Sequence, residues 1–178
     1  MTMSLHELST GSFVPMLRSL QQILDKATQQ AADKGIDLAA LPNARLAPDM
    51  FPLTKQVQIA CDTAKNATAH MIGDQAPRFE DFEQTLSDLK ARIAKTIEYI
   101  QTAQPAAFEG AGDRAIQFPL IENLVFDSNG LEYLRDWALP HFYFHVVTAY
   151  DILRHMGVEI GKRDYLSHAG IHIHPRAS

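Results

Sequence analysis

The stretch FVPMLRSLQQILDKA, from Phe13 to Ala27, carries large apolar residues at spacings of three and four. This spacing places them on one side of an α-helix, as a stripe that can pack against other helices. The stripe consists of Phe13, Leu17, Leu20, Leu24 and Ala27. The pattern predicts a helix from about Leu5 to Asp33 that stops at Lys34-Gly35, because glycine readily adopts the conformation that ends helices. Pro15 lies inside it and either stands in the first turn of a helix that begins near Ser12 or kinks a longer one.

Three further segments repeat this periodicity. The second predicted helix opens at Phe51-Pro52 with Asp49 as its N-cap and ends at Gly73, and the third runs from about Phe79–Phe82 to Thr102. A last helical region runs from about Asn129 to His155, where Pro140 should kink or restart the helix. The three apolar stripes are Leu53, Val57, Ala60, Cys61, Ala64, Ala67 and Met71; Phe82, Leu86, Leu89, Ile93, Ile97 and Ile100; and Phe142, Val146, Ala149 and Leu153. Four amphipathic helices predict an all-α four-helix bundle.

The chain between the third and fourth predicted helices follows a different pattern. Gly110 and Gly112 mark a loop, and residues 115–119 and 123–126 have the composition of two short strands facing across a turn. We therefore expect a small β-hairpin there. After the last helix, residues 161–178 are expected to be extended and partly loose. These boundaries give a single helical domain over residues 1–166 and a C-terminal tail over residues 167–178.

The composition restricts the classes of partner. The 178 residues include 16 basic and 21 acidic ones, a formal charge of 16 − 21 = −5. Binding to phosphate backbones needs clustered Lys and Arg, so neither nucleic acid nor an anionic membrane is an expected partner. No apolar run reaches the roughly 18–20 residues of a membrane span, and the N-terminus lacks a secretory pattern. The single cysteine, Cys61, cannot form an internal disulfide, and we expect a cytoplasmic protein.

Two stretches together carry a family resemblance. One runs from Asn43 to Asp62 and contains PDMFPL at its centre, and the other runs from Pro140 to Asp164 and begins PHFYFH. They resemble a bacterial family known only as a domain of unknown function (number nineteen-ninety-three), which looks like an outlying branch of the DinB/YfiT-like bundles, from Leu5 to about Leu166. The resemblance implies an up-down-down-up four-helix bundle, commonly dimeric, and no assigned function. Taken alone, the short link after Gly73 favours an antiparallel neighbour instead.

His141 and His145 are the metal-ligand candidates. Their i, i+4 spacing places both imidazoles on one helix face. The resemblance implies a divalent metal (Zn, Ni or Fe) held by three histidines, one from the second helix, and a catalytic metal needs about three protein ligands. The second helix has Gln56-Val57-Gln58 in that region and no histidine except His70 near its far end. The set is therefore incomplete, although Gln56, Gln58 or Asp62 could complete a weaker site, and no cofactor is assigned.

A second site hypothesis involves no metal. Several polar residues from the two stretches could line a pocket at one end of the bundle: Asn43, Arg45, Asp49, Gln56, Tyr143 and His145. His145 would be its general base, because imidazole titrates near neutral pH. A simpler interpretation makes Arg45 and Asp49 a loop ion pair with a helix cap, and His145 a core histidine bonded to its neighbours. Cys61 is expected to be a buried small hydrophobe, and the tail residues His168, His172 and His174 are expected to bind metal only adventitiously.

Two functions are consistent with these patterns. The first is a homodimeric bundle that binds a small-molecule ligand or is non-catalytic, as the incomplete histidine set and the small residues on the second helix indicate. The second is a metal-dependent enzyme of the thiol-transferase or hydrolase type, in which His141 and His145 hold an ion that lowers the pKa of a bound water or thiol. The dimer interface could be formed by the first and second helices or by the kinked fourth.

Overall fold

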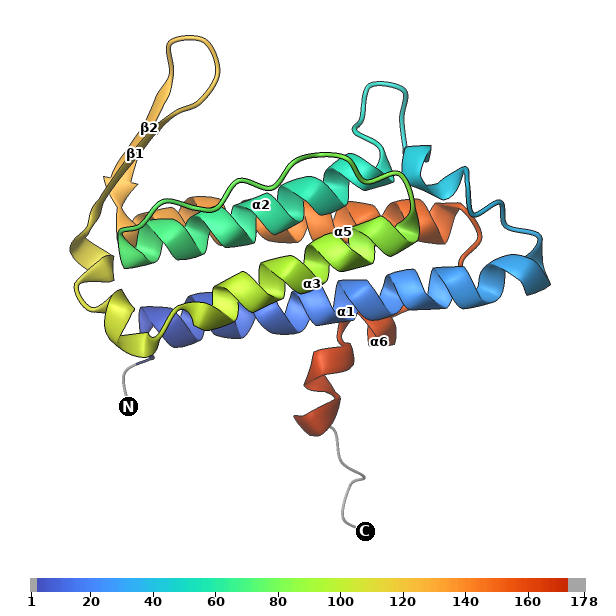
Figure 1. Ribbon diagram of the computed structural model, residues 1–178, viewed down its shortest axis with the longest axis horizontal. Helices are drawn as coiled ribbons and strands as arrows, with labels where there is room; N and C mark the ends of the chain where they lie inside the picture. The colour runs from blue at the N-terminus through green and yellow to red at the C-terminus, as the bar shows by residue number, and fades with distance from the viewer. Residues whose placement is uncertain (1–2, 173–178) are drawn as a thin grey trace.

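A computed structural model describes residues 3–172, which form four long helices packed into a bundle (Figure 1). These helices are α1 (Leu5–Lys34), α2 (Leu53–Ile72), α3 (Leu86–Thr102) and α5 (Leu139–His155). Helices α1 and α5 run in one direction, and α2 and α3 run in the other. Both α1 and α2 pack along α3 and α5, so that α1 and α2 face each other across the core. The predicted up-down-down-up bundle is therefore confirmed.

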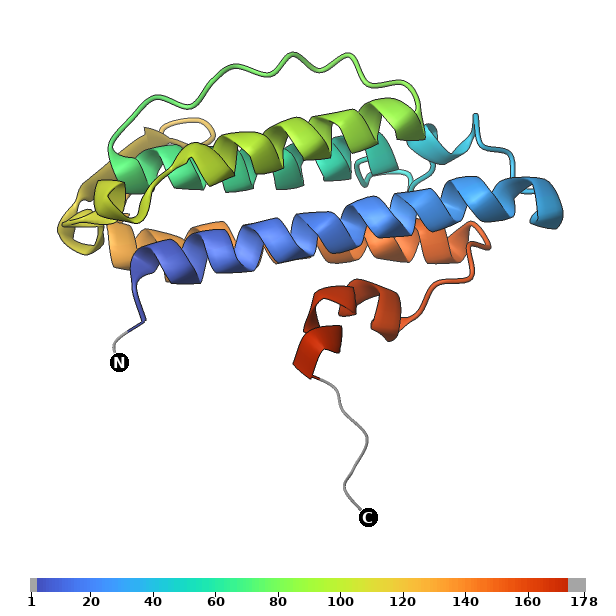
Figure 2. The same cartoon turned by 60° about the horizontal axis from the view of Figure 1, so that its bottom comes forward.

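The parallel neighbours α2 and α3 are joined by an extended crossover, residues 74–84, that runs back along the bundle (Figures 1 and 2). The 20-residue α2 is about 30 Å long, and a dozen extended residues reach roughly 40 Å. The predicted start of α3 near residues 79–82 is wrong, because Thr85 and Asp88 form a capping box that begins the helix at Leu86. Phe82, expected in the apolar stripe, is 70% exposed. Because α3 starts later than predicted, the link from α2 is long enough to return along the bundle. Helix α3 is therefore parallel to α2, and the antiparallel arrangement that a short link favoured is not observed.

The other helix ends follow local capping chemistry. Helix α1 begins at Leu5 after a capping box between Ser4 and Glu7, and it continues through Pro15 to the left-handed Gly35. Of the two alternatives for Pro15, the longer helix is the one observed. Helix α2 begins after Pro52 with no side-chain cap. The prediction of Asp49 as its N-cap is wrong, because Asp49 is an exposed loop residue outside the helix.

A β-hairpin of β1 (Ala115–Pro119) and β2 (Val125–Asn129) projects from the end of the bundle where α2 ends and α5 begins (Figure 1). Its second strand lies later in the chain than predicted, because Leu120 N–H donates to Leu124 O at 2.9 Å and so encloses the intervening residues in the loop. The short α4 (Gly130–Glu132) and a π-helix (Tyr133–Ala138) lead into α5. Pro140 lies in the first turn of α5 and has no N–H to donate to the helix before it. The interruption predicted at Pro140 therefore takes the form of the π-helix, whose turns are wider than those of an α-helix.

The core lies between the four helices. The predicted stripes of α1, α2 and α5 are buried, as are all members of the α3 stripe except Phe82. The small residues of α2, which had suggested an interface with a partner, are fully buried within the bundle: Ala60, Cys61, Ala64 and Ala67. Burial raises the pKa of the Cys61 thiol to about 12, which makes it a core residue as predicted. Within residues 3–172, no helix is both long and apolar enough to cross a membrane.

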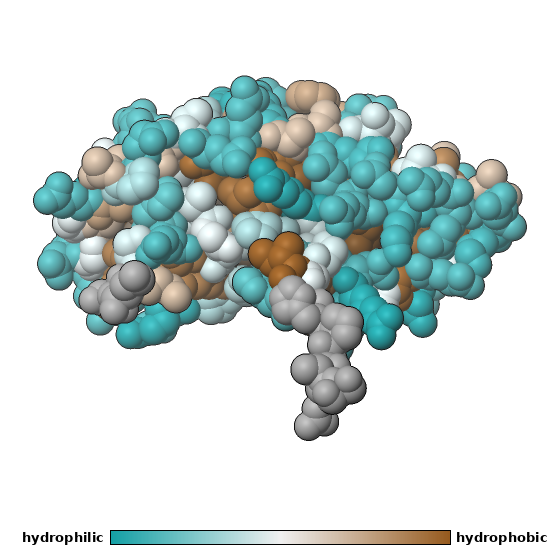
Figure 3. All heavy atoms as spheres, turned by 90° about the horizontal axis from the view of Figure 1, so that it is seen from below, coloured by the Kyte–Doolittle hydropathy of each residue, from teal (hydrophilic) through white to brown (hydrophobic). Residues whose placement is uncertain are grey.

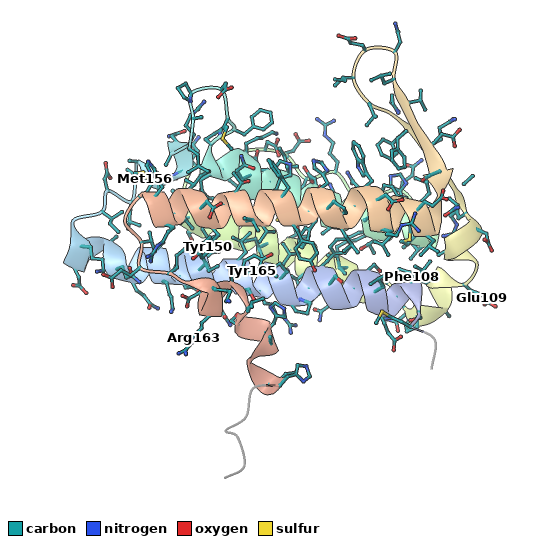
Figure 4. All side chains as sticks on the ribbon, turned by 180° about the vertical axis from the view of Figure 1, so that it is seen from behind. Phe108, Glu109, Tyr150, Met156, Arg163 and Tyr165 are labelled. Carbon is teal, nitrogen blue, oxygen red and sulfur yellow. The ribbon has the colours of Figure 1, made fainter. Side chains whose placement is uncertain are left out.

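The segment after α5 differs from the extended tail that was predicted. It folds into α6 (Lys162–Tyr165) and a 3₁₀-helix (Ser167–His172) that contact α1. Ser19 Oγ on α1 lies 2.8 Å from Ser167 Oγ and 3.1 Å from His168 Nδ1. The rings of Tyr150 and Tyr165 meet where α6 joins the bundle (Figure 4). The face seen in Figure 3 is largely hydrophilic, with hydrophobic surface in separate patches. His172 is exposed, and His174 lies outside the described residues.

Candidate functional site

A chain of polar side chains crosses the core between α2 and α5, and we call it the histidine chain. Gln56 Nε2 donates to Phe51 O at 3.0 Å, and Gln56 Oε1 lies 2.6 Å from His145 Nδ1. His145 Nε2 lies 3.0 Å from His141 Nε2, and His141 Nδ1 lies 3.4 Å from Thr63 Oγ1. The hydroxyl of Thr63 donates to Ile59 O at 2.8 Å. Gln56 and His145 are buried, at 2% and 6% exposure.

The direction of the hydrogen bonds along the chain follows from its ends. Because Phe51 O can only accept, the amide group of Gln56 faces it and the oxygen faces His145. His145 must then carry its proton on Nδ1, which leaves a lone pair on Nε2. His141 can satisfy that lone pair by donating from its own Nε2, and a neutral His141 then has its lone pair on Nδ1. The one hydroxyl proton of Thr63 is already given to Ile59 O, so among residues 3–172 His141 Nδ1 is an acceptor with no protein donor.

Burial favours the neutral forms of both imidazoles. It lowers the pKa of His145 to about 4, with a smaller contribution from the neighbouring His141. Burial also lowers the pKa of His141 below its ordinary value. Near neutral pH, both rings are therefore uncharged, and each works as a hydrogen-bond relay with one donor and one acceptor nitrogen.

The outer end of the histidine chain opens into a cleft of about 330 Å³ between α2 and the π-helix, which we call the aromatic cleft. The π-helix and the first turn of α5 place Tyr133, Trp137 and His141 along one wall. Helix α2 supplies most of the opposite wall, and the hairpin closes one side with Phe118. The complete lining is Ile59, Asp62, Thr63, Asn66, His70, Phe118, Tyr133, Trp137 and His141.

The hairpin is held over the cleft by aromatic contacts. Phe118 and Phe126, which face each other in the register of the hairpin, stack with their ring centroids 5.0 Å apart. Phe126 packs on Trp137 at 5.1 Å, and Phe118 stacks over His70 at 5.8 Å. Such pairs prefer these offset and edge-to-face arrangements. The hairpin therefore positions a wall of the cleft.

A buried ion cluster lies beside the cleft and holds the crossover against α3. The Arg92 side chain is 2% exposed and pairs at 3.0 Å with Asp62, Asp81 and Glu83. It also donates to Glu80 O at 3.1 Å. The carboxylate of Asp62 pairs in addition with Lys65 at 3.0 Å, so Asp62 is largely engaged before any ligand arrives.

The structure brings together only part of the predicted site. Gln56 and His145 meet in the histidine chain, with His141, whereas Tyr143 packs beside Phe142 and lies near Tyr165. Asn43 lies in a separate surface cleft with residues of α2 and the crossover. Arg45 donates to Pro48 O and Met50 O, and within residues 3–172 it forms no ion pair with Asp49.

Several residues of the site were missed from the sequence. Trp137 stands one helical turn before His141, and Arg92 lies within the buried face of α3 between Leu89 and Thr96. Both residues could therefore have been recognised from the sequence, Trp137 as an aromatic residue beside a candidate histidine and Arg92 as a charged residue on a buried helix face. Phe118 offered none, because only the fold brings the hairpin to α2, and His70 was considered only as the histidine near the far end of the second helix.

The donor set does not fit a catalytic metal ion. His141 and His145 direct their Nε2 atoms toward each other, and these two nitrogens are all that the pair could offer an ion. Gln58 donates to Glu83, and Asp62 pairs with Arg92 and Lys65, so both are engaged in the ion cluster. Within residues 3–172, no three His, Cys, Asp or Glu side chains form a group that could hold a metal. The pair is thus one protein ligand short of the usual three.

The helix order, the long crossover and the hairpin define a four-helix bundle of the DinB type. A crystal structure of a DinB family member protein from Shewanella denitrificans is similar over 91% of both chains, with 43% sequence identity and a TM-score of 0.83. The family model for a domain of unknown function, DUF1993, matches residues 5–166, and the chain belongs to this family. The comparison with curated proteins gave no match.

Proposed function

We propose that this protein binds a small organic molecule in the aromatic cleft. The observation that carries the proposal is the junction between the cleft and the histidine chain at His141. A series of polar groups leads from Phe51 O through the core to this wall of the cleft and leaves there an acceptor for which the described part of the chain supplies no donor. Burying polar groups is costly unless each is satisfied, and a ligand that donates to His141 would complete the series.

The dimensions and lining of the cleft support the proposal. Its volume of about 330 Å³ lies at the lower end of the range for ligand pockets, roughly 300–1,000 Å³. Such pockets combine apolar walls with a few oriented polar groups. Here the rings of Phe118, Tyr133 and Trp137 form the apolar walls, and His141, Thr63 and Asn66 supply the polar groups.

The test uses Trp137, the only tryptophan of the chain and a wall of the cleft. A library of small metabolite-like compounds is screened for saturable changes in tryptophan fluorescence and in the thermal unfolding midpoint. Asn66→Phe should abolish the response, because Asn66 is an exposed residue on the rim and the larger ring would fill the opening. Asn123→Phe, the same substitution on the exposed hairpin loop, should retain it. A response that survives in Asn66→Phe, or no saturable response to any compound, would overturn the proposal.

We further propose that the protein acts as a homodimer that meets through the outer face of α5. Phe144 and Val147 lie on this face with 58% and 39% exposure, and Phe51, 55% exposed, precedes the neighbouring α2. Large exposed apolar side chains in neighbouring positions are typical of interaction surfaces. The small residues of α2 give no support for a dimer, because they are buried inside the bundle.

The metal-dependent enzyme is the second candidate function. One observation favours it, namely the 3.0 Å approach of the Nε2 atoms of His141 and His145, since ligands of one ion must converge. The missing third ligand weighs against it, and we derive no reaction through a metal.

A further inference from the structure

The polar atom that His141 presents to the cleft is an acceptor. Gln56 directs the proton of His145 to Nδ1, His141 then donates from Nε2, and the lone pair of His141 Nδ1 remains. The hydroxyl of Thr63, 3.4 Å from His141 Nδ1, gives its proton to Ile59 O at 2.8 Å. A ligand that reaches this nitrogen must therefore bring an N–H or O–H group.

The walls of the cleft are suited to a cation. Phe118 is already stacked on both His70 and Phe126, and Tyr133 is 3% exposed, so Trp137 is the aromatic lining residue left to offer a ring face. A cation within about 6 Å of such a ring is attracted to its face. Among the described residues, the lining contains no lysine and no arginine that would repel a positive ligand. The carboxylate of Asp62 also lines the cleft, although Arg92 and Lys65 already pair with it. The attraction for a cation thus depends mainly on Trp137 and on His141.

We propose that the ligand of the aromatic cleft is a protonated primary amine on a small apolar or aromatic body, whose N–H donates to His141 Nδ1. The positive charge lies against the ring of Trp137. This inference rests on the proposed function, because it names the chemical class of the ligand for the same cleft. Gln56 acts through His145 as a positioning residue, since its amide decides which nitrogen of each imidazole holds the proton.

Three probes that share a benzyl group separate the hydrogen bond to His141 from the attraction between the positive charge and the aromatic ring. Benzylammonium offers a charge and N–H donors, benzyltrimethylammonium offers only the charge, and benzyl alcohol offers only an O–H donor. Their dissociation constants are measured near neutral pH by fluorescence of Trp137 and by titration calorimetry on the full chain. Benzylammonium should bind at least about tenfold tighter than either of the others, because it alone makes a charge-assisted hydrogen bond.

A variant locates the contact. In His141→Phe the aromatic wall is kept and the acceptor is removed, so the affinity for benzylammonium should fall about tenfold to that for benzyltrimethylammonium, which should stay unchanged. Asn123→Phe, on the hairpin loop, serves as the control. If His141→Phe does not fold, as judged by circular dichroism, the ranking of the three probes on the natural chain decides the question.

The outcomes separate this inference from the proposed function. Equal affinities for benzylammonium and benzyltrimethylammonium would overturn the hydrogen bond to His141, and equal affinity for benzyl alcohol would overturn the requirement for a cation. If no amine binds, but a neutral compound binds and Asn66→Phe abolishes its binding, the assignment of an amine ligand is wrong. The proposal that the cleft binds a small molecule then stands. If no compound of any class binds, both proposals fail.

Discussion

Gln56 Oε1 lies 2.6 Å from His145 Nδ1 and joins α2 to α5 through the buried core. Because Gln56 also donates to Phe51 O, this one side chain ties the loop before α2 to the fourth long helix of the bundle. The same contact fixes the proton of His145 and, through it, the orientation of His141 at the aromatic cleft. The stability of the fold, and the ligand recognition that we propose, therefore both depend on this one amide.

Replacing Gln56 with leucine should lower the free energy of unfolding by about 1–3 kcal/mol, because the buried His145 Nδ1 loses its acceptor and a buried, unsatisfied group costs roughly this much. Urea denaturation measures the change. Gln101→Leu, at an exposed position on α3, should change stability by less than about 0.5 kcal/mol. A Gln56→Leu protein as stable as this control would show that the contact contributes little to the fold.

The stability of the protein should fall as the pH is lowered from about 6.5 toward 4. Burial lowers the pKa of His145 to about 4 in the folded chain, whereas an unfolded histidine titrates near 6.5. Between these values the unfolded chain binds a proton that the folded chain does not, so protonation favours unfolding. His141, whose pKa burial also lowers, contributes in the same direction.

The measurement for this pH dependence is urea denaturation at several pH values between 4 and 7. His145→Gln should have a shallower dependence than the natural chain, because it lacks one of the groups concerned. His155→Gln removes an exposed histidine at the end of α5 and should leave the dependence unchanged. An identical slope for all three proteins would contradict the assignment to His145.

Arg92→Met should destabilise the protein by about 3–5 kcal/mol, because it leaves the buried carboxylate of Glu83 without its cation. The crossover should also become more sensitive to proteolysis, since Arg92 bonds to Glu80 O and pairs with Asp81. Arg135→Met is the control: Arg135 pairs with Asp136 in solvent, where an ion pair contributes at most about 1 kcal/mol. Glu83→Gln in the Arg92→Met chain should restore part of the lost stability.

The purified, untagged chain should contain far less than one equivalent of Zn, Ni or Fe, because His141 and His145 are one ligand short of the usual three. Elemental mass spectrometry on a chain with His172→Gln and His174→Gln removes adventitious binding by these histidines. Truncation after Leu166 is less suitable, since Ser167 and His168 contact Ser19. About one equivalent of metal that disappears in His145→Ala would favour the enzyme instead.

Light scattering coupled to size exclusion should give twice the 19.9 kDa mass of the chain. Phe144→Glu should shift the protein toward the monomer, because it places a charge in the proposed apolar interface on α5. Ile171→Glu makes the same kind of change at a residue that is 75% exposed on the C-terminal segment, and it should have no effect. A monomer at all concentrations would rule out the homodimer.

The amino-acid sequence was sufficient for most of the architecture, because the signals for it are local. Apolar residues at helical spacing predicted the four long helices, and Gly35 and Gly73 marked two of their ends. The start of α3 was misplaced although its signal was present, since Thr85 and Asp88 have the spacing of a capping box. Reading that box would also have revealed the long crossover that makes parallel neighbours of α2 and α3.

The candidate site depended on the tertiary structure. His141 and His145 were recognisable as a pair because their spacing is local, but their partners Gln56 and Thr63 come from another helix, and Phe118 comes from the hairpin. Periodicity tells which face of a helix is buried but not which residue of a distant helix it meets. The sequence by itself thus determined the bundle and the pairing of the two histidines. Only the packing of α5 and the hairpin against α2 determined which nitrogen of each imidazole carries the proton, which residues contact the histidines and which residues line the cleft beside them.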